Sequence, residues 1–421
     1  MSSVMPKVVI QLDEPRPKVA TCSSGRTRTP VRVYRQRVDC DGSSLVRAIT
    51  TWSGGCAVRR RSLVVSGAAI GLGLVGAGVV AVRGWGGPSE DRERSGAGAD
   101  PAASRVLGTV QPESRAGFVV LDRGRPGGEV GRAVGALVQD VRGVGGGGIV
   151  VGFGLGASLF EGAGAPGLRQ LRAMPSFAGD LLDPARSHGD LLVRVTGEDA
   201  DAVRQGVESI KSKAGTHGWT VRWAIDGFRA DNRVVGGRGL ALNPFHFSEG
   251  FGNPESEREV ADRTLVRDGQ GEPAWAVGGS YQVVRVIRFA TELWDKDSVE
   301  EQERIMGRRR DGRWLDGTPV GEQPNFAADP KGRQTPLDSH VRLAAPDRRN
   351  PPPLVRRSYS YDRGDGDIGI IFSCFQRDLA EGFEAVQKRL EGEALAKYVL
   401  TTGGGYFFVP PPGDAWIDAL G

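Results

Sequence analysis

Apolar residues recur along the chain at two spacings, which divide residues 116–230 into strands and helices. Short apolar runs and every-second-residue alternation predict strands over residues 117–121, 149–153, 190–195 and 219–225. Helical spacing predicts helices over residues 130–141 and 199–213, and Asp199 is a suitable N-terminal cap for the second. The segment therefore has the order strand, helix, strand, strand, helix, strand.

The same order returns in the second half of the chain. Strands are predicted over residues 281–289, 358–361, 367–375 and 406–409. Ser298 and Glu301 form a capping box that begins a helix extending to about Met306. A further helix is predicted over residues 379–390 from an apolar stripe of Phe383, Val386 and Leu390. The second half thus repeats the plan of the first.

Two βαββαβ units predict an α+β protein built from two ferredoxin-like units packed together, the dimeric α+β barrel type. We assign residues 105–255 to the N-terminal unit and residues 256–421 to the C-terminal unit. Each unit has one sheet face without helices, so we expect the units to pack together and leave a cleft between them. Such a cleft is a usual place for a ligand.

Residues 1–104 follow a different pattern. Residues 1–58 are polar and irregular, and we interpret them as a disordered extension or as the result of a misassigned start codon. Arg60 and Arg61 precede an uncharged run over residues 63–82, which resembles a twin-arginine (Tat) export signal. The run is long enough to span a bilayer, so a retained membrane anchor is the alternative. We assign residues 59–104 to a signal and linker and expect an exported, extracytoplasmic protein.

Composition excludes several classes of function. The net charge of +4 over 421 residues gives no concentrated basic face, which argues against nucleic-acid binding. Cys374 alone follows the predicted signal, so the exported part has no cysteine pair for a disulfide, a zinc site or an iron–sulfur cluster. The glycine run over residues 143–148 lacks a following Gly-Lys-Ser/Thr, so we predict a loop and not a phosphate site.

The chain has four histidines, and His188 and His217 lie in polar turns typical of the surface. His340 lies in the string Asp-Ser-His-Val-Arg-Leu-Ala over residues 338–344. Arg356 and Arg357 follow shortly after, at the start of a predicted strand. A neutral imidazole is a good ligand for iron, and a permanent cation can stabilise bound peroxide.

Several strings in a fixed order carry a family resemblance. They are NPFHFSEGFGNP (243–254), ELWD (292–295), EQERIMGR (301–308), FAAD (326–329), PLDSHVRLA (336–344) and RRSYSY (356–361). From about residue 110 to the C-terminus, the chain resembles the DyP-type (dye-decolorizing) haem peroxidases, especially the exported bacterial group that includes deferrochelatase/peroxidases. The first string resembles the family's distal segment, usually written GFxDGTxNP.

The resemblance implies one haem b per chain, held between the sheet and the helices of the C-terminal half. His340 would be the proximal ligand of the iron, and Arg356 the distal arginine beside the peroxide. Arg357 would point to the other face of the strand, as a structural residue or a partner of a haem propionate. The implied activity is oxidation of organic donors, such as bulky dyes, by hydrogen peroxide.

The distal acid departs from the family pattern, because Glu249 stands where the family usually has Asp. His246 replaces the first glycine of the motif, and Phe251 replaces the usual threonine. In one hypothesis Glu249 still moves the proton between the peroxide oxygens, with His246 assisting or binding a haem propionate. In the other, peroxidase chemistry is weakened and haem binding remains, as in a haem-binding or iron-acquisition protein.

Other assignments stay open at this point. Glu391, Glu393 or Asp338 is a candidate to orient the far nitrogen of His340. Five aromatic residues are candidates to relay electrons from a bulky donor at the surface, with core packing as the alternative: Trp275, Trp294, Tyr281, Tyr359 and Tyr361. The resemblance also implies two candidate partners, which are iron-uptake components and further copies of this chain in a homo-oligomer. A non-haem stress-response protein of the same fold is a third hypothesis.

Overall fold

The computed structural model describes residues 34–40, 43–49, 112–124, 130–161, 167–235, 238–320 and 322–421. The chain divides into two compact units, Met1–Asp91 and Arg92–Gly421. In the first unit, strands β1 (Tyr34–Cys40) and β2 (Ser43–Ile49) form an antiparallel hairpin. The predicted signal at residues 59–104 lies outside the described residues. Among the helices that are described, none is long and apolar enough to span a membrane.

The second unit begins with the predicted βαββαβ order. Its elements are β3 (Arg115–Arg123), α2 (Val130–Arg142), β4 (Ile149–Gly156), β5 (Leu191–Gly197), α3 (Ala200–Thr216) and β6 (Trp219–Phe228). The Asp199 side chain accepts a hydrogen bond from Ala202 N and so caps α3 as predicted. The strands lie in the order β4-β5-β3-β6, which is the ferredoxin-like arrangement. Residues 143–148 form turns and an isolated bridge, as the loop prediction required.

A small three-stranded sheet and a helix connect the two halves. The sheet comprises β7 (Ala230–Val235), β8 (Arg238–Leu242) and β9 (Ser248–Glu249), and the helix is α4 (Glu257–Thr264). Because β9 ends at Glu249, this sheet fixes the backbone position of the predicted distal acid.

The second half repeats the fold with longer insertions. Its elements are β10 (Ser280–Phe289), α5 (Thr291–Trp294), α6 (Val299–Met306), α7 (His340–Ala344), β11 (Val355–Arg356), β12 (Tyr359–Asp362), β13 (Ile368–Gln376), the π-helix η5 (Ala380–Glu384), α8 (Ala385–Arg389), β14 (Val399–Val409) and α9 (Ala415–Asp418). The Ser298 hydroxyl accepts from Glu301 N and caps α6, as predicted. The predicted helix over residues 379–390 is divided between a π-helical turn and α8.

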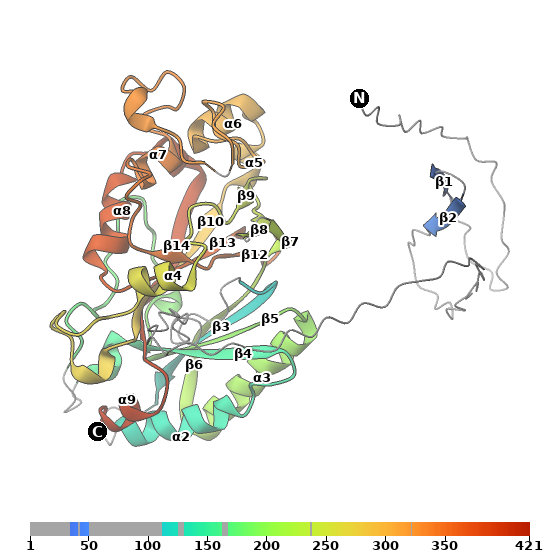
Figure 1. The fold of residues 1–421 in the computed structure, drawn as a ribbon. Helices are drawn as coiled ribbons and strands as arrows, with labels where there is room; N and C mark the ends of the chain where they lie inside the picture. The colour runs from blue at the N-terminus through green and yellow to red at the C-terminus, as the bar shows by residue number, and fades with distance from the viewer. Residues whose placement is uncertain are drawn as a thin grey trace, which may run out of the picture. The chain divides into compact units, whose positions relative to one another are not determined.

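The sheets of the two halves join at their edges. Strand β14 pairs with β4 through Phe407 and Phe408, and β12 pairs with β6 through Ser360 and Phe228. A further pairing of β10 with β13 closes the sheet through all its strands except the short β11. Figure 1 shows α2 and α3 along the strands of the first half and α8 beside those of the second. The predicted α+β barrel fold is confirmed.

The inner face of this closed sheet is filled with side chains. Alternate residues of its strands point inward and form one cluster of buried apolar groups, which includes Phe118, Val120, Trp223, Ile371 and Phe407. The intervening residues of β3 and β5, such as Val119 and Leu121, pack against α2 and α3. The halves pack together as expected, and edge-to-edge pairing converts their facing sheet surfaces into a packed interior. The expected cleft is therefore not between these surfaces, but a cavity elsewhere is lined by residues of both 105–255 and 256–421.

The packed interior yields a stability prediction. Phe407 is fully buried in the barrel and close to the β14–β4 junction. We expect Phe407→Ala to lower the free energy of unfolding by about 3–5 kcal/mol, measured by chemical denaturation, because it removes a large ring from a closely packed core. The control is Val221→Ala on β6, whose side chain is 42% exposed, and for which we expect a loss below about 1 kcal/mol. Equal losses for the two variants would contradict the packed barrel.

Candidate active site

A cavity of about 330 Å³ lies on the outer face of the C-terminal strands. Arg285, Ile287 and Phe289 of β10 and Ile370 and Phe372 of β13 line one side of it. These residues alternate with the ones that point into the barrel, so the pleat of the strands separates the cavity from the core. The opposite side comes from α7, from the segment around α8 and from residues 243–253.

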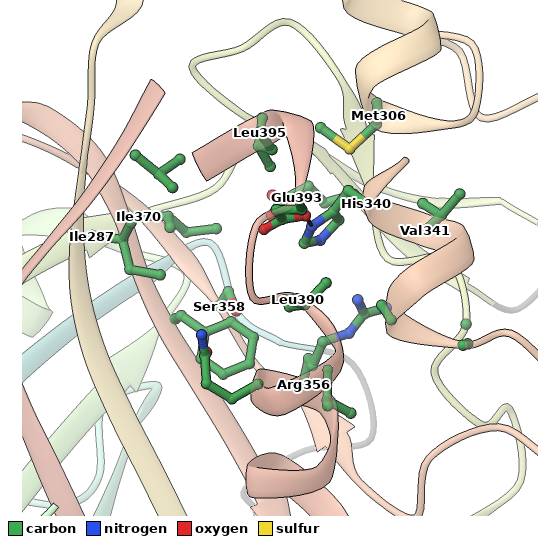
Figure 2. Close-up of a pocket in the computed structure, with 18 of the residues that line it drawn as sticks. Ile287, Met306, His340, Val341, Arg356, Ser358, Ile370, Leu390, Glu393 and Leu395 are labelled. Atoms are coloured by element: carbon green, nitrogen blue, oxygen red, sulfur yellow. Dashed lines mark hydrogen bonds and ion pairs between the residues drawn. The ribbon is translucent and has the colours of Figure 1, made fainter. Parts of the chain in front are cut away.

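His340 is the first residue of α7 and lines this cavity. Its Nδ1 lies 2.7 Å from Oε2 of Glu393, a carboxylate whose side chain is only 8% exposed. An ionised carboxylate accepts hydrogen bonds but cannot donate them, so this contact holds the proton on Nδ1. Nε2 is then left with its lone pair available to a metal. Figure 2 shows Glu393 against the imidazole at the edge of the cavity.

Two arginines fix the short helix that carries His340. Arg342 donates to three backbone carbonyls, those of Thr335 and Asp329 at 2.7 Å and of Phe326 at 3.1 Å. Arg389 of α8 donates to the carbonyls of Leu343 and Ala344, both at 3.0 Å, at the C-terminal end of α7. The Arg389 bonds satisfy carbonyls that the helix leaves free, and the Arg342 bonds attach the helix to the preceding segment, so the imidazole is held by a rigid support.

Arg356 reaches the same cavity from β11. Asn253 holds its backbone with two bonds of 2.9 Å, accepting from Arg356 N and donating to Arg356 O. The Arg356 guanidinium donates to the carbonyl of Phe251. These contacts attach the predicted distal segment to the strand that carries the predicted distal arginine.

Glu249 is the third predicted site residue that lines the cavity. Asn243 positions it, because Nδ2 of Asn243 donates to Oε1 of Glu249 at 3.0 Å. The other end of the same amide, Oδ1, accepts from the backbone nitrogens of Phe245 at 3.1 Å and Phe247 at 2.9 Å. A single buried side chain therefore folds residues 243–249 into a tight loop and fixes the carboxylate at its end.

The cavity is rich in buried positive charge. Arg229, Arg308, Arg348 and Arg356 all line it. Burial lowers the pKa of Arg308 to about 10, and the Glu249 carboxylate acts in the opposite direction. Burial also lowers the pKa of Arg229 and Arg356, and Glu249 again opposes the shift. A region with several desolvated cations and Glu249 as a shared counter-charge favours anionic ligands.

The cavity fits a large planar cofactor with carboxylates at one edge. An imidazole with a free Nε2 supplies an iron ligand, and buried guanidinium groups supply partners for carboxylates. The intervening walls are apolar and come from strands, α6 and the segment after α8, through Ile287, Ile370, Phe372, Met306, Leu390 and Leu395. Figure 2 shows several of these side chains around the space beside His340. Among the described residues, no cluster of His, Cys, Asp and Glu offers a separate metal site.

Two other predicted site residues lie away from this cavity. His246 is exposed, and its Nε2 lies 3.1 Å from Oδ1 of Asp295. It does not line the cavity, so its position does not support assistance to Glu249 or binding of a cofactor carboxylate. Arg357 is buried beside Tyr359 and Arg194 on the other face of the strand, as alternation predicts, and it does not line the cavity either.

The remaining open assignments can now be compared with the structure. Glu393 is the partner of His340, whereas Glu391 and Asp338 are exposed. Of the proposed relay aromatics, Trp294, Tyr281, Tyr359 and Tyr361 are buried, and Trp275 packs against the core. Cys374 is fully buried, as predicted. His188 and His217 are half-buried.

Some functional residues lie in the quoted strings but received no role from the sequence. Asn243 and Asn253 each precede a proline and bracket the distal segment, which was a usable signal for paired structural amides. Arg308 and Arg348 lack such a signal, because arginine is frequent throughout the chain and sequence alone does not show which ones are buried.

The fold and the site together define a protein with an imidazole-based cofactor pocket on a closed α+β barrel. Comparison with known families is specific: the N-terminal domain of Dyp-type peroxidases matches residues 139–229, and the C-terminal domain matches residues 241–414. This chain belongs to the DyP-type peroxidase family. Haem is the cofactor of this family, so membership supports the predicted cofactor, and the non-haem hypothesis loses its support.

Individual relatives agree with the family assignment. A deferrochelatase from Shigella flexneri is 38% identical over 285 residues, which cover 63% of this chain and 66% of the relative. A deferrochelatase from Yersinia pestis is 39% identical over 277 residues, covering 61% and 62% of the two chains. The chain thus spans slightly less than two thirds of the length of these curated relatives.

Solved structures give the same result. A DyP-type peroxidase from Streptomyces coelicolor matches with a TM-score of 0.64 and 30% identity, over 71% of this chain and 89% of the other. One from Cellulomonas bogoriensis matches with a TM-score of 0.62 and 28% identity, over 72% and 90%.

The loop that positions Glu249 yields a prediction. We expect Asn243→Leu to leave the backbone nitrogens of Phe245 and Phe247 without an acceptor and to lower the free energy of unfolding by at least about 2 kcal/mol, measured by denaturation. Asn243→Asp is the comparison variant, because it keeps the acceptor for both backbone nitrogens while it replaces the donor to Glu249 with a carboxylate oxygen. If Asn243→Leu and Asn243→Asp are equally stable, the double acceptor does not hold the loop.

Proposed function

We propose that this protein is a haem peroxidase that uses hydrogen peroxide to oxidise organic donors. In the overall reaction, peroxide accepts two electrons and two protons to give two water molecules. Two donor molecules each lose one electron and one proton. The observation that carries this proposal is the cavity in which His340, fixed by Glu393, shares one space with Arg356 and Glu249.

The residues present can hold haem. His340 Nε2 would bind the iron, and Glu393 would increase the basicity of the imidazole through Nδ1. Arg308 and Arg229 are the buried cations available to the cofactor's carboxylates. When bound, haem supplies the redox chemistry that cleaves the O–O bond and withdraws electrons from the donor.

Glu249 and Arg356 would act on peroxide. The Glu249 carboxylate can take a proton from one peroxide oxygen and return it to the other. Arg356 remains cationic despite its burial and stabilises negative charge on the oxygen that has lost its proton. Because Asn243 restrains Oε1 of Glu249, the longer side chain does not have the full freedom that an extra methylene would give it.

Two variants test this proposal, with an anthraquinone dye as donor and the absorption spectrum as the readout of haem binding. Glu249→Gln should keep the spectrum of bound haem and lose about 10²–10⁴-fold in the rate of reaction with peroxide, because it removes a general acid–base group. His340→Ala should lose the spectrum of the ligated haem. An unchanged Soret band in His340→Ala would contradict the ligand assignment, and full activity in Glu249→Gln would contradict the acid.

A second candidate function is removal of iron from haem. It is supported by the curated relatives, which are named deferrochelatases and are 38–39% identical. Release of iron-free porphyrin, detected by its fluorescence without peroxide, would favour this activity over peroxidase turnover. Partners in iron uptake belong with this second candidate, and a homo-oligomeric state is part of the proposal for either function.

We also propose export by the twin-arginine route, supported by Arg60, Arg61 and the uncharged run over residues 63–82. Replacing both arginines by lysine should leave the protein in the cytoplasm, because the Tat machinery reads the arginine pair. The measurement is fractionation of cells that express the two forms. Export of the double variant at the unchanged level would exclude this route. Wild-type protein that stays in the membrane fraction would favour the retained anchor.

A further inference from the structure

A second cavity, of about 360 Å³, adjoins the first. The two share the lining residues Phe251, Gly252, Asn253, Trp314, Arg348 and Pro351. None of the functions assigned above uses the second cavity. Its other walls come from α4 through Arg263 and from the segment that contains Val320 and Gln323.

Arg348 is the principal charged group between the two cavities. Its Nε donates to Oε1 of Gln323 at 2.8 Å, and its guanidinium carbon lies 5.0 Å from the centre of the Trp314 ring. No described carboxylate forms an ion pair with it. Burial, together with the positive charges of Arg356 and Arg263, lowers the pKa of Arg348 to about 10. Arg348 is a desolvated cation beside two other cations, and this arrangement favours binding of an anion.

Arg263 supplies a second donor to the same cavity. Its Nη2 is paired with Glu259, but its Nη1 is buried and has no hydrogen-bond acceptor among the described residues. Leaving a buried charged donor unsatisfied is costly. A ligand oxygen in the second cavity would remove this cost.

Gly252 leaves space where the cations meet. A side-chain carbon added at Gly252 would lie 3.4 Å from Nη2 of Arg348 and 3.4 Å from Nη2 of Arg356. Two guanidinium groups therefore converge on a point that contains no side chain, and φ of +84° at this residue favours glycine. This point opens to both cavities, because Gly252 lines each of them.

The rest of the second cavity suits a flat ring. Trp314 is buried, its Nε1 donates to the carbonyl of Glu322 at 3.0 Å, and its ring is therefore fixed in orientation. Phe251, Val320 and Pro351 add apolar surface. The acidic residues at the site, Glu255 and Glu259, are exposed, and Glu259 is already paired with Arg263. This arrangement favours a ligand with a single negative charge next to an aromatic ring.

We propose that the second cavity binds an aromatic carboxylate as electron donor, with the carboxylate at Arg348 and Arg263 and the ring beside Trp314 and Phe251. The proposal rests on the proposed function, which it deepens by naming the class of donor. The ring would lie against the wall that the two cavities share, so it would be next to the cofactor pocket without entering it.

Binding can be tested without turnover, using benzoate as the probe and benzamide as its uncharged analogue. Calorimetry on the haem-loaded protein without peroxide should give one benzoate site, with benzamide at least about tenfold weaker. Arg348→Gln should weaken benzoate by about tenfold or more and leave benzamide unchanged. The control is Arg304→Gln, the same charge change on an exposed residue of α6, and it should bind benzoate like the wild type. Equal affinity for the two probes would overturn the proposal.

A second variant and the haem-free protein provide two further tests of benzoate binding. Val320→Trp changes a residue that lines only the second cavity, and it should block benzoate by filling the space for the ring. If the haem-free protein binds benzoate and the haem-loaded protein does not, the arginines serve the carboxylates of the cofactor and the donor site is refuted. Because these measurements need no peroxide, failure of peroxidase activity would leave them valid, and failure of binding would leave the peroxidase proposal intact.

Discussion

The pairing of the two half-sheets at their edges is the constraint on which the rest of this structure depends. Once β14 pairs with β4 and β12 with β6, the helix-free faces of both halves become one interior, and packed side chains fill it. A ligand site must then lie on an outer face. In the first half, α2 and α3 cover that face closely. In the second half, a π-helical turn and the short α8 leave the cavity between helix and strands.

The chemistry of the cavity follows from how its buried charges are arranged. On one side, the contact between Nδ1 of His340 and the Glu393 carboxylate leaves Nε2 of the imidazole available to iron. On the other, Arg229, Arg308 and Arg356 share Glu249 as a counter-charge, and Arg348 lies nearby without a carboxylate partner among the described residues. Such an excess of buried cations is unfavourable without an anion. The site therefore needs its ligands, which are the carboxylates of a cofactor, the peroxide anion and, in the adjoining cavity, the carboxylate of a donor.

Sequence periodicity predicted the order of the elements correctly, because strands and helices with one buried face have strong local patterns. It did not predict how the halves join, since the paired edges are far apart in the chain and contribute only a few residues each, such as Phe407 and Ser360. Family motifs brought His340, Arg356 and Glu249 to one cavity as expected. They did not indicate that His246, which has a φ of +68°, directs its side chain to Asp295 and not into the cavity. The choice of Glu393 over Glu391 also required the fold, as the two differ only in which way they point.

The central claim is that Nε2 of His340 binds the iron of a haem in the cavity on the outer face of β10 and β13. The most direct measurement is anomalous X-ray diffraction at the iron edge from crystals of the haem-loaded protein. The account predicts a single iron peak at bonding distance from Nε2 of His340, with Nδ1 still bound to Glu393 and with the haem in the cavity that Glu249 and Arg356 also line. An iron peak bonded to any other residue, or haem bound outside this cavity, would contradict it.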